Sequence, residues 1–362
     1  MPVATKVAMV VDALPNIGGA EKVLMAAMEL FPHAPIYTLL YNRTAFLRTP
    51  VANRKVHASY INRLPLSDTY YKNYFPLMPH AIRQFDLCDY DLILSFSYSV
   101  AHGVSTQPGQ IHLSYTYTPM RYAWRDIGLN GFQRPQSKVL NFIFQPFRSW
   151  DLAVTAKIDR IAAVSHWIAD WVERAYQRES TVIYPPVDVE RFSPAPERDD
   201  YYITVSRLVS HKRVDLLLKA FNLLKRPLLV VGEGPEHSRL EHLSGPYSRL
   251  LGFQSDSDVA ALLSRARAYV CAGEEDFGIA AVEAQAAGCP VIAYRKGGVL
   301  ETVVEHETGL FFDEPTVGSL VDGIERFERQ RLSFNSYQIS TRAQCFNKER
   351  FFREFTKFVG CP

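Results

Sequence analysis

The chain has 362 residues, of which 47% are hydrophobic and 12% aromatic, so it is long and apolar enough for two folded domains and is not a disordered chain. Its formal net charge of +2 is too small to argue for nucleic acid, and it has no zinc-finger spacing and no RNA-binding aromatic motif. No stretch approaches the roughly 18 apolar residues of a transmembrane helix, and Val7–Val11 is too short for a signal-peptide core. Five scattered cysteines without a Cys-x-x-Cys pair fit reduced thiols. We therefore expect a cytoplasmic protein.

The first half of the chain opens with a strand, a loop and a helix. Lys6 to Val11 predicts the strand, Asp12 to Gly19 the loop and Ala20 to Leu30 the helix, an order typical of nucleotide-binding folds. Further predicted strands cover residues 92–96, 111–115, 160–164 and 181–184. Pro185-Pro186 and the segment from Phe192 to Asp200 indicate a linker.

Strands and helices continue to alternate after this linker. A strand from Tyr202 leads into a cationic loop and a helix, and the strand at Leu228–Val231 leads into a glycine turn. Two more strands are predicted at residues 290–294 and 308–312. This second unit runs to about Glu328, and the last segment, from Phe334 to Val359, is helical by pattern. The order of the predicted elements is β-α-β-α throughout.

Two glutamates bracket the most informative segment. Glu275 and Glu283 are separated by seven residues, and the run from Ile279 to Ala287 has helical character, with Gly288 as a C-cap. The small side chains of this helix allow tight packing, so we expect Glu283 to be buried. A buried carboxylate is costly unless it is hydrogen-bonded, and the hydroxyls of a ribose would satisfy it.

The start of the same helix suits a phosphate. Gly278 and Ile279 would offer backbone N–H groups at a helix N-terminus, which is an anion-binding position. A diphosphate on these amides and sugar hydroxyls on the two acids would suit a sugar nucleotide. The alternative interpretation is an ordinary helix start with acidic residues near its positive end.

Two cations in the loop after the Tyr202 strand complete this pattern. Arg207 and Lys212 would offset the charge that builds on a departing diphosphate without a metal. The alternative is a pair of exposed basic residues near a helix start, where a cation is slightly unfavourable.

These motifs in order resemble the retaining family 4 glycosyltransferases of the GT-B fold. The resemblance is dense over residues 200–315 and rests there on Glu275-x7-Glu283, Ser206-Arg207-Leu208 with Lys212, Gly232-Glu-Gly-Pro235, Gly297-Gly298 with Glu301, and Thr308-Gly309. It is thinner in the first half, on Gly18-Gly19-Ala20-Glu21 and on Tyr117-Thr-Pro-Met-Arg-Tyr-Ala-Trp124. The second of these strings resembles a branch that acts on bacterial polysaccharide and O-antigen precursors.

The resemblance implies an α/β fold of two Rossmann-like domains that face each other across a cleft. Residues 1–185, with a C-terminal helix at about 340–362 crossing back to them, would form the acceptor-binding domain. Residues 186–339 would form the domain that binds the nucleotide sugar.

The implied activity is a metal-independent, retaining transfer of a glucose- or mannose-type hexose from a nucleoside diphosphate sugar to a growing, lipid-linked polysaccharide precursor. Arg207 and Lys212 would stabilise the departing diphosphate, Glu275 would bind sugar hydroxyls and Glu283 the ribose. Further donor contacts are expected from Gly19, Phe253, Phe277, Gly278 and Ile279. No cofactor is expected, and a UDP-sugar is favoured over GDP-mannose as donor.

Two Asp-x-Asp strings could suggest a metal. Asp89-Tyr-Asp91 precedes a strand instead of following it, and Asp256-Ser-Asp258 lies where a helix is predicted to begin at Val259, a position typical of capping. We therefore expect no catalytic divalent ion.

The acceptor-side candidates are Gly18, His102, Tyr117 and Arg121. His102 follows the strand at 92–96 and so would lie at its carboxyl end. Relatives with the Thr-Pro-Met-Arg string often carry histidine at the positions of Tyr98 and Tyr117, so the role of that histidine is not transferred directly. A histidine beside a glycine can also be purely structural.

Residues 54–83 interleave basic and aromatic side chains, and a second such group follows at Trp124, Arg125, Phe142, Phe144, Phe147 and Arg148. This mixture suits an anionic membrane surface, and with a lipid-linked acceptor it leads us to expect peripheral contact at the inner face of the plasma membrane. The alternative is a solvated face whose aromatic rings turn into the core.

Two other functions are left open. A sugar-nucleotide epimerase or hydrolase of the same fold would need an added acid or base, for which only His102 is a candidate. A non-catalytic, nucleotide-binding subunit would need no turnover at all.

Overall fold

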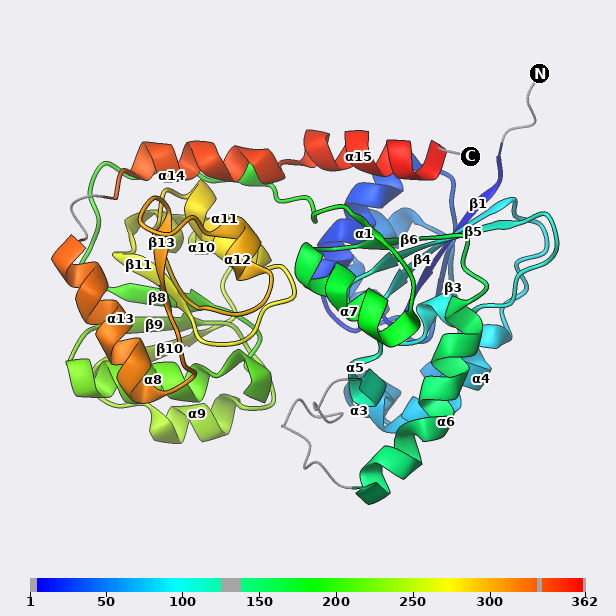
Figure 1. Cartoon of the computed structure of the whole chain (residues 1–362), viewed down its shortest axis with the longest axis horizontal. Helices are drawn as coiled ribbons and strands as arrows, with labels where there is room; N and C mark the ends of the chain where they lie inside the picture. The colour runs from blue at the N-terminus through cyan, green and yellow to red at the C-terminus, as the bar shows by residue number, and fades with distance from the viewer. Residues whose placement is uncertain (1–4, 125–137, 331–333, 361–362) are drawn as a thin grey trace. The chain divides into compact units, whose positions relative to one another are not determined.

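A computed structural model of the chain describes residues 5–124, 138–330 and 334–360, which form two compact units (Figure 1). Unit 1 contains the described residues up to Tyr184 and those from Phe351 onward, and unit 2 is Pro185–Arg350. The chain thus returns to unit 1 at residue 351 and not at about 340, because helix α14 (Ser336–Ala343) packs in unit 2, where Ser340 Oγ donates to the carbonyl of Ala286 at 2.8 Å.

Unit 1 is built on a seven-stranded sheet in the order β3-β2-β1-β4-β5-β6-β7, and every pair is parallel. The order reverses between β1 and β4, which is the switch point of a doubly wound sheet. The strands are β1 Val7–Val11, β2 Ile36–Thr38, β3 Val56–Ala58, β4 Leu92–Ser97, β5 Ile111–Thr116, β6 Arg160–Ala163 and β7 Thr181–Val182.

The C-terminal helix packs on the sheet of unit 1. Phe351 and Phe355 of that helix are buried and meet the rings of Tyr115 and Phe96 from the sheet. The helices are α1 Gly19–Leu30, α2 Arg43–Phe46, α3 Ser67–Tyr70, α4 Met78–Arg83, α5 Arg121–Trp124, α6 Lys138–Thr155, α7 His166–Tyr176 and α15 Lys348–Gly360. Short 3-10 turns, η1 to η4, lie at Pro50–Asn53, Tyr60–Arg63, Tyr71–Leu77 and Ala101–Gly103.

Unit 2 repeats the same architecture with six parallel strands in the order β10-β9-β8-β11-β12-β13. The strands are β8 Tyr202–Val205, β9 Leu228–Val231, β10 Ser248–Gly252, β11 Ala268–Cys271, β12 Val291–Tyr294 and β13 Gly309–Phe312. With α14, its helices are α8 Val214–Leu224, α9 His237–Leu243, α10 Asp256–Arg265, α11 Ile279–Ala286, α12 Val299–Thr302 and α13 Val317–Gln330, and its 3-10 turns include η5 Val189–Arg191 and η6 Ser210–Lys212. The expected class of two Rossmann-like α/β domains is confirmed.

The sequence pattern does not predict four of the strands, β2, β3, β10 and β11. β2 and β3 have three residues each, too few for a period to show. β10 is only partly buried, and β11 is a short, fully buried run that periodicity cannot assign. Among the helices that the structure describes, none combines the length and the apolar character needed to span a membrane.

Candidate functional site

The predicted donor residues of unit 2 lie at the carboxyl edge of its sheet. β8 is followed by the loop of Arg207 and Lys212, and β11, its neighbour, is followed by Glu275. β12 pairs with β11 and is followed by the Gly297-Gly298 turn. Because the carboxyl ends of neighbouring parallel strands meet at one edge, three separate stretches of sequence converge there.

Lys212 and Glu275 are in direct contact. Lys212 Nζ lies 2.5 Å from Glu275 Oε2, and the two side chains remain 24% and 15% exposed. Gly273 allows this approach, because a Cβ at that position would stand 2.8 Å from the Cα of Lys212. A cation and a carboxylate predicted for the two ends of a sugar–phosphate bond are therefore adjacent.

The loop that carries Glu275 is fixed from the β12 side. The Gly298 N–H donates to the carbonyl oxygen of Glu275 at 2.7 Å. Lys296 Nζ forms an ion pair with Glu274 Oε2 at 3.1 Å. The Gly-Gly turn of the sequence motif thus holds the acidic loop in place.

Helix α11 begins directly after this loop. Gly278 is its N-cap, with φ +94° and ψ +51°, a left-handed conformation that glycine adopts without strain. Within the described residues, no acceptor is found for the amides of Gly278 and Ile279. The Phe277 side chain, in contrast, is buried and packs edge-on against Phe346, so its predicted donor contact would have to come from its backbone.

Glu283, in the middle of α11, is only 7% exposed, and the expected burial is confirmed. Its Oε1 lies 3.2 Å from Nη2 of Arg191. Arg191 belongs to none of the motifs from which the site was predicted. That a buried carboxylate needs a partner could be read from the sequence, but the identity of the partner depends on a fold that joins residues 92 positions apart.

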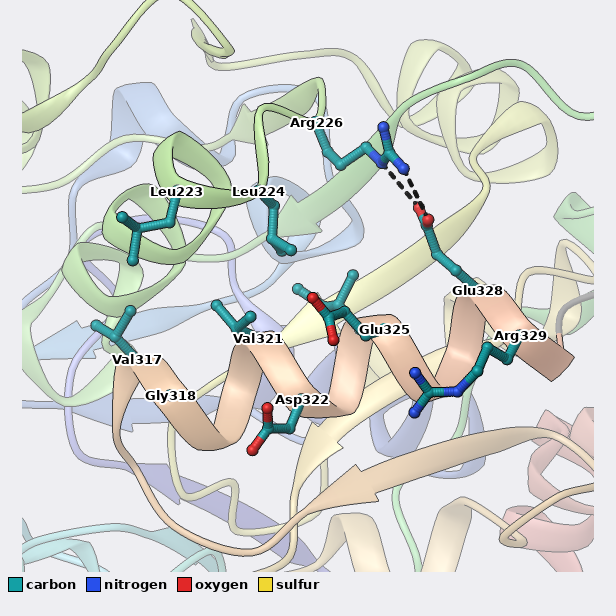
Figure 2. A pocket seen from close by; sticks show the side chains of 11 residues that line it. Leu223, Leu224, Arg226, Val317, Gly318, Val321, Asp322, Glu325, Glu328 and Arg329 are labelled. Carbon is teal, nitrogen blue, oxygen red and sulfur yellow. Dashed lines mark hydrogen bonds and ion pairs between the residues drawn. The ribbon is translucent and has the colours of Figure 1, made fainter.

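Arg207 and Phe253 are open to solvent. Phe253, directly after β10, is 76% exposed, and Arg207 forms no ion pair with any described residue. Figure 2 shows a groove elsewhere in unit 2, between α8 and α13. The volume of this groove is about 700 Å³. None of the predicted donor residues lines it.

The glycine loop of unit 1 is hydrogen-bonded to the protein itself. Glu21 Oε2 accepts the Gly18 N–H at 2.9 Å, and the Tyr117 hydroxyl donates to the carbonyl of Ala20 at 2.8 Å. Burial raises the pKa of Tyr117 well above its ordinary value. Gly19 is the first residue of α1, and Arg121 is the partly exposed first residue of α5. The acceptor roles of Gly18, Tyr117 and Arg121 and the donor role of Gly19 stay predictions.

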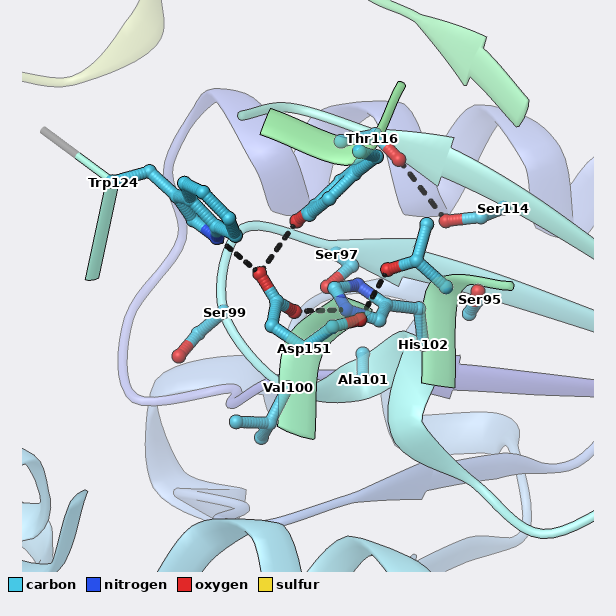
Figure 3. Close-up of polar contacts among 12 residues, drawn as sticks. Ser95, Ser97, Ser99, Val100, Ala101, His102, Ser114, Thr116, Trp124 and Asp151 are labelled. Atoms are coloured by element: carbon cyan, nitrogen blue, oxygen red, sulfur yellow. Dashed lines mark hydrogen bonds and ion pairs between the residues drawn. The ribbon is translucent and has the colours of Figure 1, made fainter. Parts of the chain in front are cut away.

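His102 differs most from expectation, because it is only 2% exposed. Figure 3 shows its polar contacts, which lie within the protein. Its Nδ1 lies 2.8 Å from Ser97 Oγ and its Nε2 lies 2.7 Å from Asp151 Oδ1. Asp151 Oδ2 also accepts the Trp124 indole N–H at 2.7 Å and the Tyr176 hydroxyl at 2.9 Å. Both ring nitrogens are thus used inside unit 1, where α6 covers η4, and direct acceptor contact by His102 would require the network to open.

A second buried carboxylate fixes the loop before His102. Asp12, at the end of β1, accepts the backbone N–H groups of Tyr98, Ser99, Val100 and Ala101 at 2.5 to 3.0 Å. Burial raises the pKa of Asp12, while the hydrogen bonds from Tyr98, Val100 and Ala101 oppose the rise. The carboxyl end of β4 is therefore tied to β1.

The two Asp-x-Asp strings belong to element boundaries. Asp91 Oδ2 accepts the backbone N–H of Lys6 at 2.8 Å, just before β4. Helix α10 begins at Asp256 and not at Val259, because Ser255 caps it by accepting the N–H of Asp258 at 3.2 Å. The absence of a catalytic divalent ion stays a prediction.

Comparison with known proteins follows the division into units. Residues 188–344, all in unit 2, match the family described as glycosyl transferases group 1. A GDP-mannose-dependent alpha-(1-6)-phosphatidylinositol monomannoside mannosyltransferase of Mycolicibacterium smegmatis is 31% identical over 173 residues, which cover 39% of this chain and 44% of that protein. A D-inositol 3-phosphate glycosyltransferase of Mycobacterium bovis is 32% identical over 171 residues, covering 41% and 36%. The chain thus spans less than half the length of both relatives.

Solved structures match over the whole chain. Sucrose-phosphate synthase from Thermosynechococcus elongatus superposes with a TM-score of 0.77 at 18% identity and covers 98% of each chain. Anabaena HepE in complex with UDP and glucose gives a TM-score of 0.71 at 15% identity, covering 99% of this chain and all of that one. At these identities the likeness is one of fold and extends over both units, whereas the match to the family described as glycosyl transferases group 1 lies in unit 2.

Proposed function

We propose that the protein is a retaining, metal-independent hexosyltransferase that uses a nucleoside diphosphate sugar. The observation that carries the proposal is the contact of Lys212 with Glu275 at 2.5 Å, next to the start of α11. A cation, a carboxylate and two backbone amides at one sheet edge match the phosphates and hydroxyls of such a donor.

Each group has a defined part in the reaction. The bond between the anomeric carbon and the terminal phosphate oxygen breaks, and Lys212, Arg207 and the α11 amides stabilise the charge that develops on the diphosphate. Glu275 holds the sugar through its hydroxyls, and Glu283 holds the ribose. The acceptor hydroxyl forms the new bond on the same face of the sugar and gives its proton to the departing phosphate, so no protein base is consumed.

The donor is a UDP-sugar or GDP-mannose, with UDP favoured. The solved HepE complexes contain UDP and UDP-glucose, whereas the mycolicibacterial relative is GDP-mannose-dependent. These two similarities support different bases, so a donor panel must include both.

We further propose that the acceptor is a lipid-linked saccharide of the polysaccharide type and that the protein binds it at an anionic membrane surface. Exposed apolar side chains of unit 1 support this: Leu66, Tyr70, Leu77, Phe142 and Ile143. Arg63 and Arg83 are exposed near the first three. Trp124 and Arg148 do not contribute, because Trp124 donates to Asp151 and Arg148 Nε donates to the carbonyl of Ala123 at 2.6 Å, and Arg125 lies outside the described residues.

The transfer is tested with purified protein, a chelator, UDP-glucose, UDP-galactose or GDP-mannose, and a polyprenyl-diphosphate-linked sugar as acceptor. We expect release of one nucleoside diphosphate and, by NMR, a product with the anomeric configuration of the donor. Release of diphosphate without an acceptor would favour the hydrolase alternative, and no release from any donor would favour a non-catalytic subunit. An inverted product would contradict the retaining mechanism.

The membrane surface is tested by sedimentation with phosphatidylcholine vesicles that do or do not contain phosphatidylglycerol. We expect binding only to the anionic vesicles and weaker binding by Phe142→Ser. Leu223→Ser, which replaces an exposed leucine of unit 2, is the matched control and should bind like the wild type. Equal loss in both variants, or binding that ignores lipid charge, would argue against this surface.

A further inference from the structure

Arg191 lies between two carboxylates beside α11 and forms an ion pair with each of them. It is the last residue of η5, and its Nη2 lies 3.2 Å from Glu283 Oε1 while its Nη1 lies 2.6 Å from Asp256 Oδ2. Its guanidinium also stacks over the ring of Phe192 at 4.7 Å. The arginine is therefore held by a helix start, a helix interior and an aromatic ring at once.

The two carboxylates that it contacts differ in burial. The Glu283 side chain is 9% exposed, whereas that of Asp256 is 69% exposed. A surface ion pair contributes little, but a charged group shielded from water depends on its partner for orientation. The contact with Glu283 is thus the consequential one, and Asp256 anchors the opposite edge of the guanidinium.

The geometry of the two groups lets Arg191 fix the plane of the Glu283 carboxylate through a single contact. A guanidinium is planar and offers five donors in a fixed fork, so it defines the plane of a carboxylate more strictly than an ammonium does. A carboxylate has about four acceptor positions, so the single contact with Arg191 does not by itself use all of those of Glu283.

We infer that Arg191 is a positioning residue of the nucleotide site, which acts through Glu283 and thereby sets the preference for a ribose diol. This inference rests on the proposed function, in which Glu283 receives the ribose. It extends the site to a residue of the segment before β8, outside the Glu-x7-Glu motif and the cationic loop.

The test measures binding of UDP and 2′,3′-dideoxy-UDP by calorimetry, and of the guanosine pair if GDP is the stronger ligand. We compare wild type, Arg191→Met, Arg191→Lys, Glu283→Gln and the double variant. Arg267→Met is the matched control, because Arg267 is also largely buried and paired with a glutamate of unit 2, Glu328, at 3.0 Å. Far-UV circular dichroism checks that each variant is folded.

We expect Arg191→Met to weaken binding of the ribonucleotide about tenfold and to leave binding of the dideoxynucleotide unchanged. Glu283→Gln should do the same, the double variant should add little, and Arg191→Lys should restore part of the loss. Arg267→Met should keep the wild-type discrimination.

Three results would overturn the inference. Unchanged discrimination in Arg191→Met would remove its link to the ribose while leaving the proposed function in place. Equal weakening of both nucleotides would show a structural role alone. If the wild type binds none of the nucleoside diphosphates, the proposed function fails and the inference fails with it.

Discussion

The two units share one strand order but use their polar side chains in opposite ways. In unit 2 the charged groups at the carboxyl edge of the sheet, such as Lys212 and Glu275, are partly exposed and lie on loops. In unit 1 the corresponding edge is closed, because Asp12 and His102 are buried and bonded to the protein itself. The comparison shows that a shared fold fixes where a site can form, and that the loops decide whether groups are left for a ligand.

The largest expected effect tests the open edge of unit 2. Glu275→Ala should lower the transfer rate by about two to three orders of magnitude, because the proposed function places this carboxylate on the reacting sugar. The free energy of unfolding should change by no more than about 1 kcal/mol, since the pair with Lys212 is partly exposed. Initial rates and urea unfolding measure the two quantities.

The control for this variant is Glu307→Ala, which removes an exposed glutamate of the same unit. It should keep the wild-type rate. A Glu275→Ala protein that retains full activity would show that the Lys212–Glu275 pair is structural, and the contrast between the units would disappear.

The next effect tests the closed edge of unit 1. Asp12→Ala leaves four N–H groups without an acceptor, three of them buried, so the free energy of unfolding should fall by about 3 kcal/mol or more. All four tryptophans, Trp124, Trp150, Trp167 and Trp171, belong to unit 1, so the midpoint of urea unfolding followed by tryptophan fluorescence reports this unit. A shift equivalent to less than about 1 kcal/mol would mean that the loop does not depend on Asp12.

His102→Ala should destabilise unit 1 by about 2 kcal/mol, because it removes the imidazole that is hydrogen-bonded to the buried carboxylate of Asp151. Nucleotide affinity should stay unchanged. His80→Ala, at an exposed histidine of the same unit, should alter neither property. If His102→Ala instead left stability intact and raised the KM for the acceptor, the prediction of direct acceptor contact would be right.

The last effect is a dependence on pH. His112 is fully buried beside Ser95 and near His102, and burial lowers its pKa from 6.5 to about 3, while Asp159 accepts its backbone N–H. Above pH 6.5 both states are neutral, and below it only the unfolded chain gains the proton, so stability falls as the pH drops towards 3. At pH 5 the expected loss is about 2 kcal/mol.

His112→Gln removes this titration. Tryptophan-monitored unfolding at pH 7 and pH 5 should therefore show a smaller loss for the variant than for the wild type. An identical loss in both proteins would assign the pH dependence to other groups.

The sequence predicts the groups at the sheet edge of unit 2 better than the contacts of unit 1, for a physical reason. Lys212, Glu275 and Gly278 are placed by strand-loop-helix units, whose periods and glycines can be read over a few residues. Arg191 is placed by a contact across 92 residues and His102 by one across 49, which depend on packing that no local pattern encodes. The fold class could be predicted because the alternation of elements is itself local, whereas three-residue strands such as β2 could not.

The most direct test of the account is the melting temperature of the wild type, Lys212→Met, Glu283→Gln and His102→Ala with excess UDP, GDP or ADP in the presence of a chelator. A ligand that binds only the folded state stabilises it by about 2.7 kcal/mol at a hundredfold excess over its Kd, which raises the melting temperature. We predict a rise with one nucleotide for the wild type and for His102→Ala, and a much smaller rise for Lys212→Met and Glu283→Gln. Equal rises in all four proteins, or none in any, would contradict the assignment of the nucleotide site to the open edge of unit 2.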